Sequence, residues 1–166
     1  MNKSREHLRE FCRSRSEKAF RALAAAHSSL VYSTALRRLA NDRAAAEDAT
    51  QEVFVLLASK ASSLPDDVSL AGWLYRQCCR LTANYVRAES RRRKREMVAA
   101  GDREDSGGSE SVVSPDVVEE VDEALLALRE QEREALVLRF LEGRNHGSVG
   151  AVLGISEEAA RKRIAR

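Results

Sequence analysis

Apolar residues recur at helical spacing along most of the chain, and no stretch alternates between apolar and polar residues as a strand does. Residues 17–40 carry this pattern over a length that predicts two helices. Residues 44–61 predict one amphipathic helix, with Val53, Leu56 and Leu57 on its apolar face. After a loop at 62–69, a long helix is expected from about Leu70 to Arg95, capped by Ser69. The expected fold class is therefore all-α.

The last 50 residues predict a different helical unit. Residues 117–130 and 131–143 form two amphipathic helices, and the segment "SVGAVLGISEEAARKRIAR" follows. Its pattern predicts a helix ending at Leu153, a tight turn at Gly154 and a second helix capped by Ser156. Ile155 and Ala160 are expected to face inward, as is Ile164, and the small Gly150 permits a close crossing. This is the pattern of a helix-turn-helix.

The second helix of this unit carries its basic residues on the outer face. Arg161, Lys162 and Ala165 face outward, with Arg163 and Arg166 beside them. Arginine and lysine can donate hydrogen bonds to guanine edges or to phosphates in the major groove. The pattern favours a DNA-reading helix, although a plain helical hairpin with solvated arginines stays an alternative.

The long helix combines an apolar face with a stripe of arginines. Leu74, Cys78 and Leu81 lie on the apolar face, and Trp73 is interpreted as a core residue rather than a stacking platform. A second stripe, about a third of a turn away, can follow a nucleic-acid backbone, and its asparagine could contact a base. The stripe consists of Arg76, Arg80, Asn84, Arg87 and Arg91.

Charge divides the 166 residues into three parts. Residues 1–97 hold 19 Lys and Arg against 11 Asp and Glu, a net charge of +8, whereas residues 98–123 hold 1 against 9, a net charge of −8. Residues 124–166 return to a net charge of +2. Residues 101–115 are rich in Gly, Ser and acids and predict a flexible linker. The segregation favours a polyanionic partner, with ordinary solvated helix faces as the alternative.

Several classes of protein are disfavoured by the composition. The three cysteines, Cys12, Cys78 and Cys79, do not form a disulfide framework and fit a reducing cytoplasm. The charged N-terminus does not resemble a signal peptide, and no apolar run suits a membrane span. We find no metal-ligand spacing, phosphate loop or Ser/His/Asp arrangement, so we expect no metal, no cofactor and no enzymatic activity.

Three motifs together resemble bacterial sigma factors. "AAEDATQEVFVLL" is similar to region 2.2, "GWLYRQCCRLTANYVRAESRRRKRE" to regions 2.3 and 2.4, and "ALLALREQEREALVLRFLEGRNHGSVGAVLGISEEAARKRIAR" to region 4. Their order, with an acidic linker between them and no region 3, resembles an extracytoplasmic-function (group IV) sigma factor. The resemblance implies region 2 over 1–97, a linker over 98–117 and region 4 over 118–166.

The resemblance also implies partners, which are core RNA polymerase, through its β′ clamp and β flap, and promoter DNA. An anti-sigma factor is a further candidate partner. The loop over 64–70 would hold a flipped base. Core-polymerase binding would involve Asp48, Gln51, Glu52 and Phe54. Binding of the −10 element would involve Arg76, Arg80, Asn84, Arg87 and Arg91, and binding of the −35 element Ser156, Arg161, Lys162, Arg163 and Ala165.

The chain departs from the family pattern at a few positions. Arg80 stands where Asn is frequent and Asn84 where Asp is frequent, and the last helix stops earlier than in the family, which leads us to expect a truncated form. Two other functions are weighed. A helix-turn-helix regulator that acts without polymerase leaves "EDATQEVF" unexplained, and an interaction protein would keep the polymerase contact but not promoter reading.

Overall fold

The computed structural model describes residues 3–65, 69–100 and 115–165, and over these residues it contains helices and no strand. The predicted all-α class is confirmed. A short 3-10 helix at Ala61–Ser63 and a π-helical segment at Val137–Leu141 complete the described elements. The helices are α1 Lys3–Ser14, α2 Glu17–Arg38, α3 Arg43–Lys60, α4 Leu70–Ala100, α5 Pro115–Ala127, α6 Glu130–Leu136, α7 His146–Leu153 and α8 Glu157–Ile164.

Local capping residues fix where several helices begin. The side chain of Asp42 accepts a hydrogen bond from the Ala45 amide at 3.0 Å, at the start of α3. Ser69 accepts one from the Gly72 amide at 3.0 Å, which confirms its predicted role at the start of α4. Such caps satisfy amides that have no partner within the helix. The starts of these helices are therefore encoded by short polar side chains in the local sequence.

The prediction of two helices over 17–40 is wrong, because α2 is continuous from Glu17 to Arg38. The segment contains neither glycine nor proline, and its alanine-rich centre favours helix propagation. The helix ends where Ala40 and Asn41 adopt positive φ angles of 51° and 64°. A single long helix thus supplies buried residues to both halves of the molecule.

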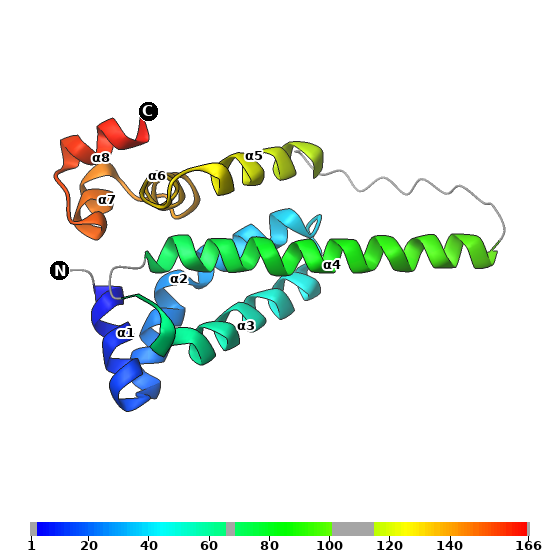
Figure 1. Cartoon of the computed structure of the whole chain (residues 1–166), viewed down its shortest axis with the longest axis horizontal. Helices are drawn as coiled ribbons and strands as arrows, with labels where there is room; N and C mark the ends of the chain where they lie inside the picture. The colour runs from blue at the N-terminus through cyan, green and yellow to red at the C-terminus, as the bar shows by residue number, and fades with distance from the viewer. Residues whose placement is uncertain (1–2, 66–68, 101–114, 166) are drawn as a thin grey trace.

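Helices α1–α4 form an N-terminal bundle, residues 3–100 (Figure 1). Fully buried side chains fill its core, among them Leu23, Val53 and Leu74. Trp73 is 8% exposed and packs in this core, which confirms its interpretation as a core residue. The apolar face predicted for the long helix packs inward as expected, because Cys78 belongs to the same cluster and Leu81 packs against it.

Helices α5–α8 form a C-terminal module, residues 115–165, which packs against both α2 and α4 of the bundle (Figure 1). A second core joins the two units, since Leu30 and Cys79 of the bundle cluster with Val137, Leu138 and Val149 of the module. The predicted linker over 98–117 begins and ends within helices, because α4 reaches Ala100 and α5 starts at Pro115. Its central residues 101–114 lie outside the described residues.

The predicted helix-turn-helix is present in the C-terminal module. Gly154 takes the left-handed conformation with φ 70°, and the Ser156 side chain accepts a hydrogen bond from the Ala159 amide at 3.2 Å. Ala160 is fully buried, and Ile155 and Ile164 pack against the same core. The close approach at Gly150 is to the turn itself, because a Cβ there would lie 2.7 Å from the Ile155 carbonyl oxygen.

Two glycines of α7 should therefore respond in opposite ways to alanine. Gly150→Ala should destabilise the fold by about 1–3 kcal/mol, since backbone must move to admit the methyl group. Gly147→Ala should stabilise it by about 0.5–1 kcal/mol, because alanine favours the helix and the nearest atom, 3.3 Å away, ends the flexible side chain of Glu157. Urea denaturation followed by circular dichroism measures both. Equal stabilisation by the two changes would contradict the close approach at Gly150.

Candidate nucleic-acid interface

An acidic groove lies on the outer face of α3. Asp48, Gln51 and Glu52 are exposed and line a groove of about 550 Å³ together with Val55. Their spacing of three and four residues places them on one side of the helix. The structure therefore brings together three of the four residues predicted to bind core polymerase.

Phe54, the fourth residue of that set, lies apart from the groove. It is half-buried and packs against the bundle core, as expected for a residue two positions from Glu52 on a helix. The apolar side chain beside the acids is instead Val55, which is 62% exposed. Sequence reasoning missed Val55, although its spacing of three from Glu52 and seven from Asp48 was a usable signal.

Tyr85 of α4 closes one side of the acidic groove. Its hydroxyl donates a hydrogen bond to Glu52 Oε1 at 2.9 Å, and this bond is the main reason that the pKa of Tyr85 is raised. The bond joins α3 to α4 at the solvent-exposed edge of the bundle. The orientation of Glu52 is therefore set by a residue 33 positions further along the chain.

The basic stripe on α4 is only partly open to solvent. Arg80, Asn84, Arg87 and Arg91 are exposed, as predicted for a surface that follows a nucleic-acid backbone. Arg76 differs, because its Nη2 lies 3.6 Å from Glu130 Oε1 of α6. The structure thus groups four of the five predicted residues on an open surface and places the fifth against the C-terminal module.

A groove of about 410 Å³ lies beside this stripe, between α4 and the end of α3. Arg80 and Asn84 line it on one side, and Lys60 lines it from α3. Leu64 and Trp73 supply apolar surface. Apolar surface beside basic side chains can hold an unstacked base and its phosphate. The loop predicted to hold a flipped base begins here, and its residues 66–68 lie outside the described residues.

Helix α8 presents most of its predicted DNA-binding residues to solvent. Ser156, Arg161, Lys162 and Ala165 are exposed, and the Ser156 hydroxyl is engaged as the helix cap. Both basic residues have an acidic neighbour one turn earlier, because Arg161 lies 3.6 Å from Glu157 and Lys162 lies 2.8 Å from Glu158. These acids also suit the positive end of the helix dipole. Arg166 lies outside the described residues.

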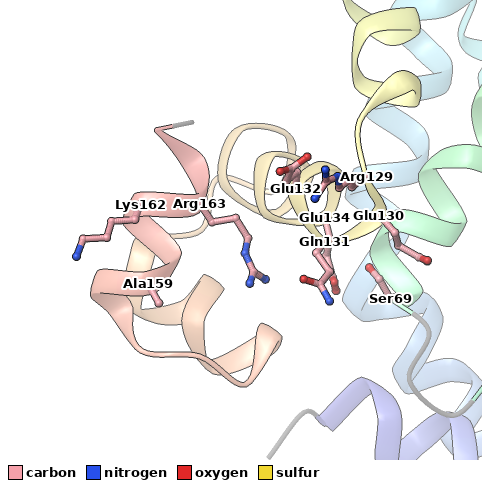
Figure 2. A pocket seen from close by; sticks show the side chains of 9 residues that line it. All are labelled: Ser69, Arg129, Glu130, Gln131, Glu132, Glu134, Ala159, Lys162 and Arg163. Atoms are coloured by element: carbon pink, nitrogen blue, oxygen red, sulfur yellow. The ribbon is translucent and has the colours of Figure 1, made fainter.

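Arg163 lies on a different side of α8 from Lys162. Figure 2 shows Arg163 extending toward α6, whereas Lys162 extends away from it. Arg163 lines a groove shared with Glu134 of α6 and Ser69 at the start of α4. Burial raises the pKa of Glu134, although a hydrogen bond with Ser69 and the charges of Arg5 and Arg163 oppose the rise. Arg163 is therefore half-buried and faces the protein itself in this structure.

The acids of α8 should weaken DNA binding in the free chain. Replacing Glu157 and Glu158 by glutamine should strengthen binding to a duplex selected by the wild-type chain from a random pool, by about 0.5–1 kcal/mol. The reason is that both acids repel phosphates and hold Arg161 and Lys162 in exposed ion pairs. Fluorescence anisotropy titration measures the change, with Glu6→Gln/Glu10→Gln on α1 as the charge-matched control. Weaker binding would mean that the carboxylates accept hydrogen bonds from cytosine.

The remaining groups that could carry chemistry are structural. Cys78 and Cys79 are buried, free thiols, as the packing interpretation predicted. Among the residues that the structure describes, no group of three His, Cys, Asp or Glu is arranged to hold a metal ion. Within the same residues, no helix is both long and apolar enough to cross a membrane.

Each of the two modules matches a known protein family. Residues 23–92 match the family described as "Sigma-70 region 2", and residues 124–166 match "Sigma-70, region 4". The two matches together cover more than half of the 166 residues. No curated protein matches the chain in sequence.

Two solved structures resemble the chain at low identity. CnrH, in complex with the cytosolic domain of CnrY, is 20% identical with a TM-score of 0.49, and the match covers 99% of this chain and 92% of that one. The sigma factor RpoE, in complex with the anti-sigma factor NepR from Bartonella quintana, is 20% identical with a TM-score of 0.40, over 90% of this chain and 91% of that one. Both scores are low, so neither structure adds to what the family matches show.

Proposed function

Because this chain belongs to the sigma-70 family and carries region 2 followed by region 4, we propose that it is an alternative sigma factor of the extracytoplasmic-function group. It binds core RNA polymerase, recognises two promoter elements and directs opening of the DNA and initiation of transcription in the cytoplasm. Sigma factors are transcription initiation factors rather than enzymes. The chemistry of this protein is therefore recognition, and polymerase supplies the active site.

The observation that carries the proposal is the acidic groove on α3. Asp48, Gln51 and Glu52 surround the exposed Val55, which offers two carboxylates and an apolar anchor on one rigid helix. Such a surface is complementary to a basic, partly apolar helix pair of a partner, which in this family is the β′ clamp of polymerase. A regulator that only binds duplex DNA has no use for this surface. Phe54 supports α3 from the core side rather than forming the contact.

The two promoter elements are assigned to separate surfaces. The exposed arginines of α4 and the adjoining groove hold the melted −10 strand, with Arg80 and Asn84 at the mouth of the groove. Helix α8 reads the −35 element as duplex, with Arg161 and Lys162 directed at the major groove. The binding energy gained by the single strand favours the open state of the DNA. An anti-sigma factor stays a predicted partner.

The proposal is tested by reconstitution with core polymerase from the organism that encodes the chain. Co-purification is measured first, and run-off transcription follows on a promoter selected from a random pool by the complex. We expect both to succeed. Binding of duplex DNA without binding of polymerase would identify a helix-turn-helix regulator instead. Binding of polymerase without any transcript would identify an interaction protein.

A further inference from the structure

One carboxylate of the C-terminal module is buried among polar groups of the N-terminal bundle. Asp122 of α5 is 1% exposed at its side chain. Its Oδ1 accepts hydrogen bonds from Tyr75 Oη at 2.5 Å and from Arg37 Nη2 at 2.8 Å. Its Oδ2 accepts one from Arg38 Nη1 at 2.5 Å. We name these four residues the Asp122 cluster, and all three bonds cross from one module to the other.

The cluster is built so that its charges are compensated only while the modules are together. Arg38 is held in place by a second bond, from its Nε to Thr82 Oγ1 at 2.7 Å. A buried carboxylate loses its hydration and needs such partners, and removing one of them leaves an uncompensated charge. Two guanidinium groups and a phenol meet this need here.

The remainder of the seam between the modules is continuous with the cluster. Tyr75 and Cys79 pack against Val137 and Leu138 in the shared core. At another point of the seam, His27 Nδ1 lies 3.1 Å from Glu142 Oε1, and both side chains are less than a tenth exposed. The modules are thus joined by apolar packing and by buried polar contacts.

The contacts between the two modules also involve predicted DNA-binding residues from each of them. Arg76 of the basic stripe pairs with Glu130, and Arg163 of α8 lines the groove that includes Ser69 of the bundle. Both side chains are half-buried while the modules are together. Residues 101–114 number 14, and a fully extended chain of that length spans about 50 Å, so the covalent connection permits separation.

We propose that the Asp122 cluster holds the two modules of the free chain closed, and that the modules separate when the chain takes up promoter DNA on polymerase. The first half stands on the contacts alone. The second half rests on the proposed function, since it names what opening releases, which is Arg76 for the −10 strand and Arg163 for the −35 duplex.

The chain contains its own reporter of opening. Cys79 is 2% exposed and belongs to the shared core of the seam, whereas Cys78 is fully buried within the bundle. Burial raises the pKa of Cys79 to about 11, and the nearby Asp122 charge adds to the rise, so the closed form holds little thiolate. Separation of the modules exposes Cys79 alone. Global unfolding exposes both thiols together.

The experiment follows the reaction of a maleimide with the full chain by intact mass, with Cys12→Ser as the background. In Asp122→Asn, a single label should appear about 10- to 100-fold faster than in the parent, because the two arginines lose their charged partner. Glu123→Gln is the matched control, since it removes one exposed charge from the neighbouring position of α5. Its labelling rate should equal that of the parent. Cys79→Ala should remove the single label.

Equal labelling rates in Asp122→Asn and the parent would overturn the proposal, as would a parent whose Cys79 reacts as fast as Cys12 does in the wild-type chain. If Asp122→Asn takes up two labels at once, it has unfolded, and Arg37→Gln decides instead. Arg37 is 30% exposed at its side chain, and its loss should also increase the rate of the single labelling reaction. No increase would refute the role of the Asp122 cluster.

Because these measurements use neither polymerase nor DNA, failure of the proposed function leaves them unaffected. Addition of polymerase and promoter DNA should raise the single-label rate of the parent, and no rise would refute opening.

Discussion

Reversing the two acids of the α3 groove is expected to abolish binding to core polymerase. In Asp48→Lys/Glu52→Lys, two attractive charges become repulsive at a charge-complementary contact, which costs several kcal/mol and reduces affinity by about a thousandfold or more. Both side chains are exposed, so the fold should be retained, with loss only of the Tyr85 bond to Glu52. Co-purification with core polymerase measures the loss, and circular dichroism checks the fold.

The control for this pair is Glu6→Lys/Glu10→Lys on α1. It changes the net charge of the chain by the same amount and replaces two exposed acids, but it lies on another helix of the bundle. We expect it to bind polymerase as the parent does. Full binding by the α3 double variant would show that this groove is not the contact. Equal loss of binding in both variants would show that the loss depends on the net charge of the chain and not on the groove.

Removing the two outward basic residues of α8 is expected to produce the largest loss of duplex binding. Arg161→Ala/Lys162→Ala should weaken binding to a selected −35 duplex by about 1–3 kcal/mol for each residue that contacts a base edge. For each residue that contacts a phosphate, the slope of log affinity against log salt should fall by about 0.9. Titrations at several salt concentrations, on selected and scrambled duplexes, separate these two roles.

Stability should change little in this variant, because both ion pairs that it removes are exposed. Lys18→Ala/Arg21→Ala on α2 is the charge-matched control and should keep both affinity and salt slope. A loss confined to the control would refute α8 as the DNA-reading helix. Loss on selected and scrambled duplexes alike would assign Arg161 and Lys162 to phosphates rather than to bases.

Sequence alone determined features that depend on neighbours within one or two helical turns. The caps at Ser69 and Ser156, the left-handed turn at Gly154 and the inward face of α8 are all present as predicted. A cap or a turn is decided by the conformational preference of one residue and by amides three positions away, which the sequence shows directly. For the same reason the acids of α3 could be placed on one face from their spacing.

Only the tertiary structure decided which of these faces meet. Phe54 and Val55 are adjacent in the sequence and both apolar, and packing of α3 in the bundle turned the first inward and left the second exposed. Arg76 is spaced like the other arginines of its stripe, yet α6 engages it. Helical periodicity does not specify which neighbour a face will contact, so the pairing of Arg76 with α6 was not predictable.

Asp122 shows most clearly what local spacing in the sequence does not predict. It stands in the acidic stretch 98–123, on a helix predicted from periodicity alone, but it is buried against Arg37, a residue 85 positions earlier. The sequence specified the helices, their caps and their charged faces, because these follow from local spacing. The tertiary structure decided that one of those charges would join the two modules, because only folding brings distant groups close enough to replace the water that each has lost.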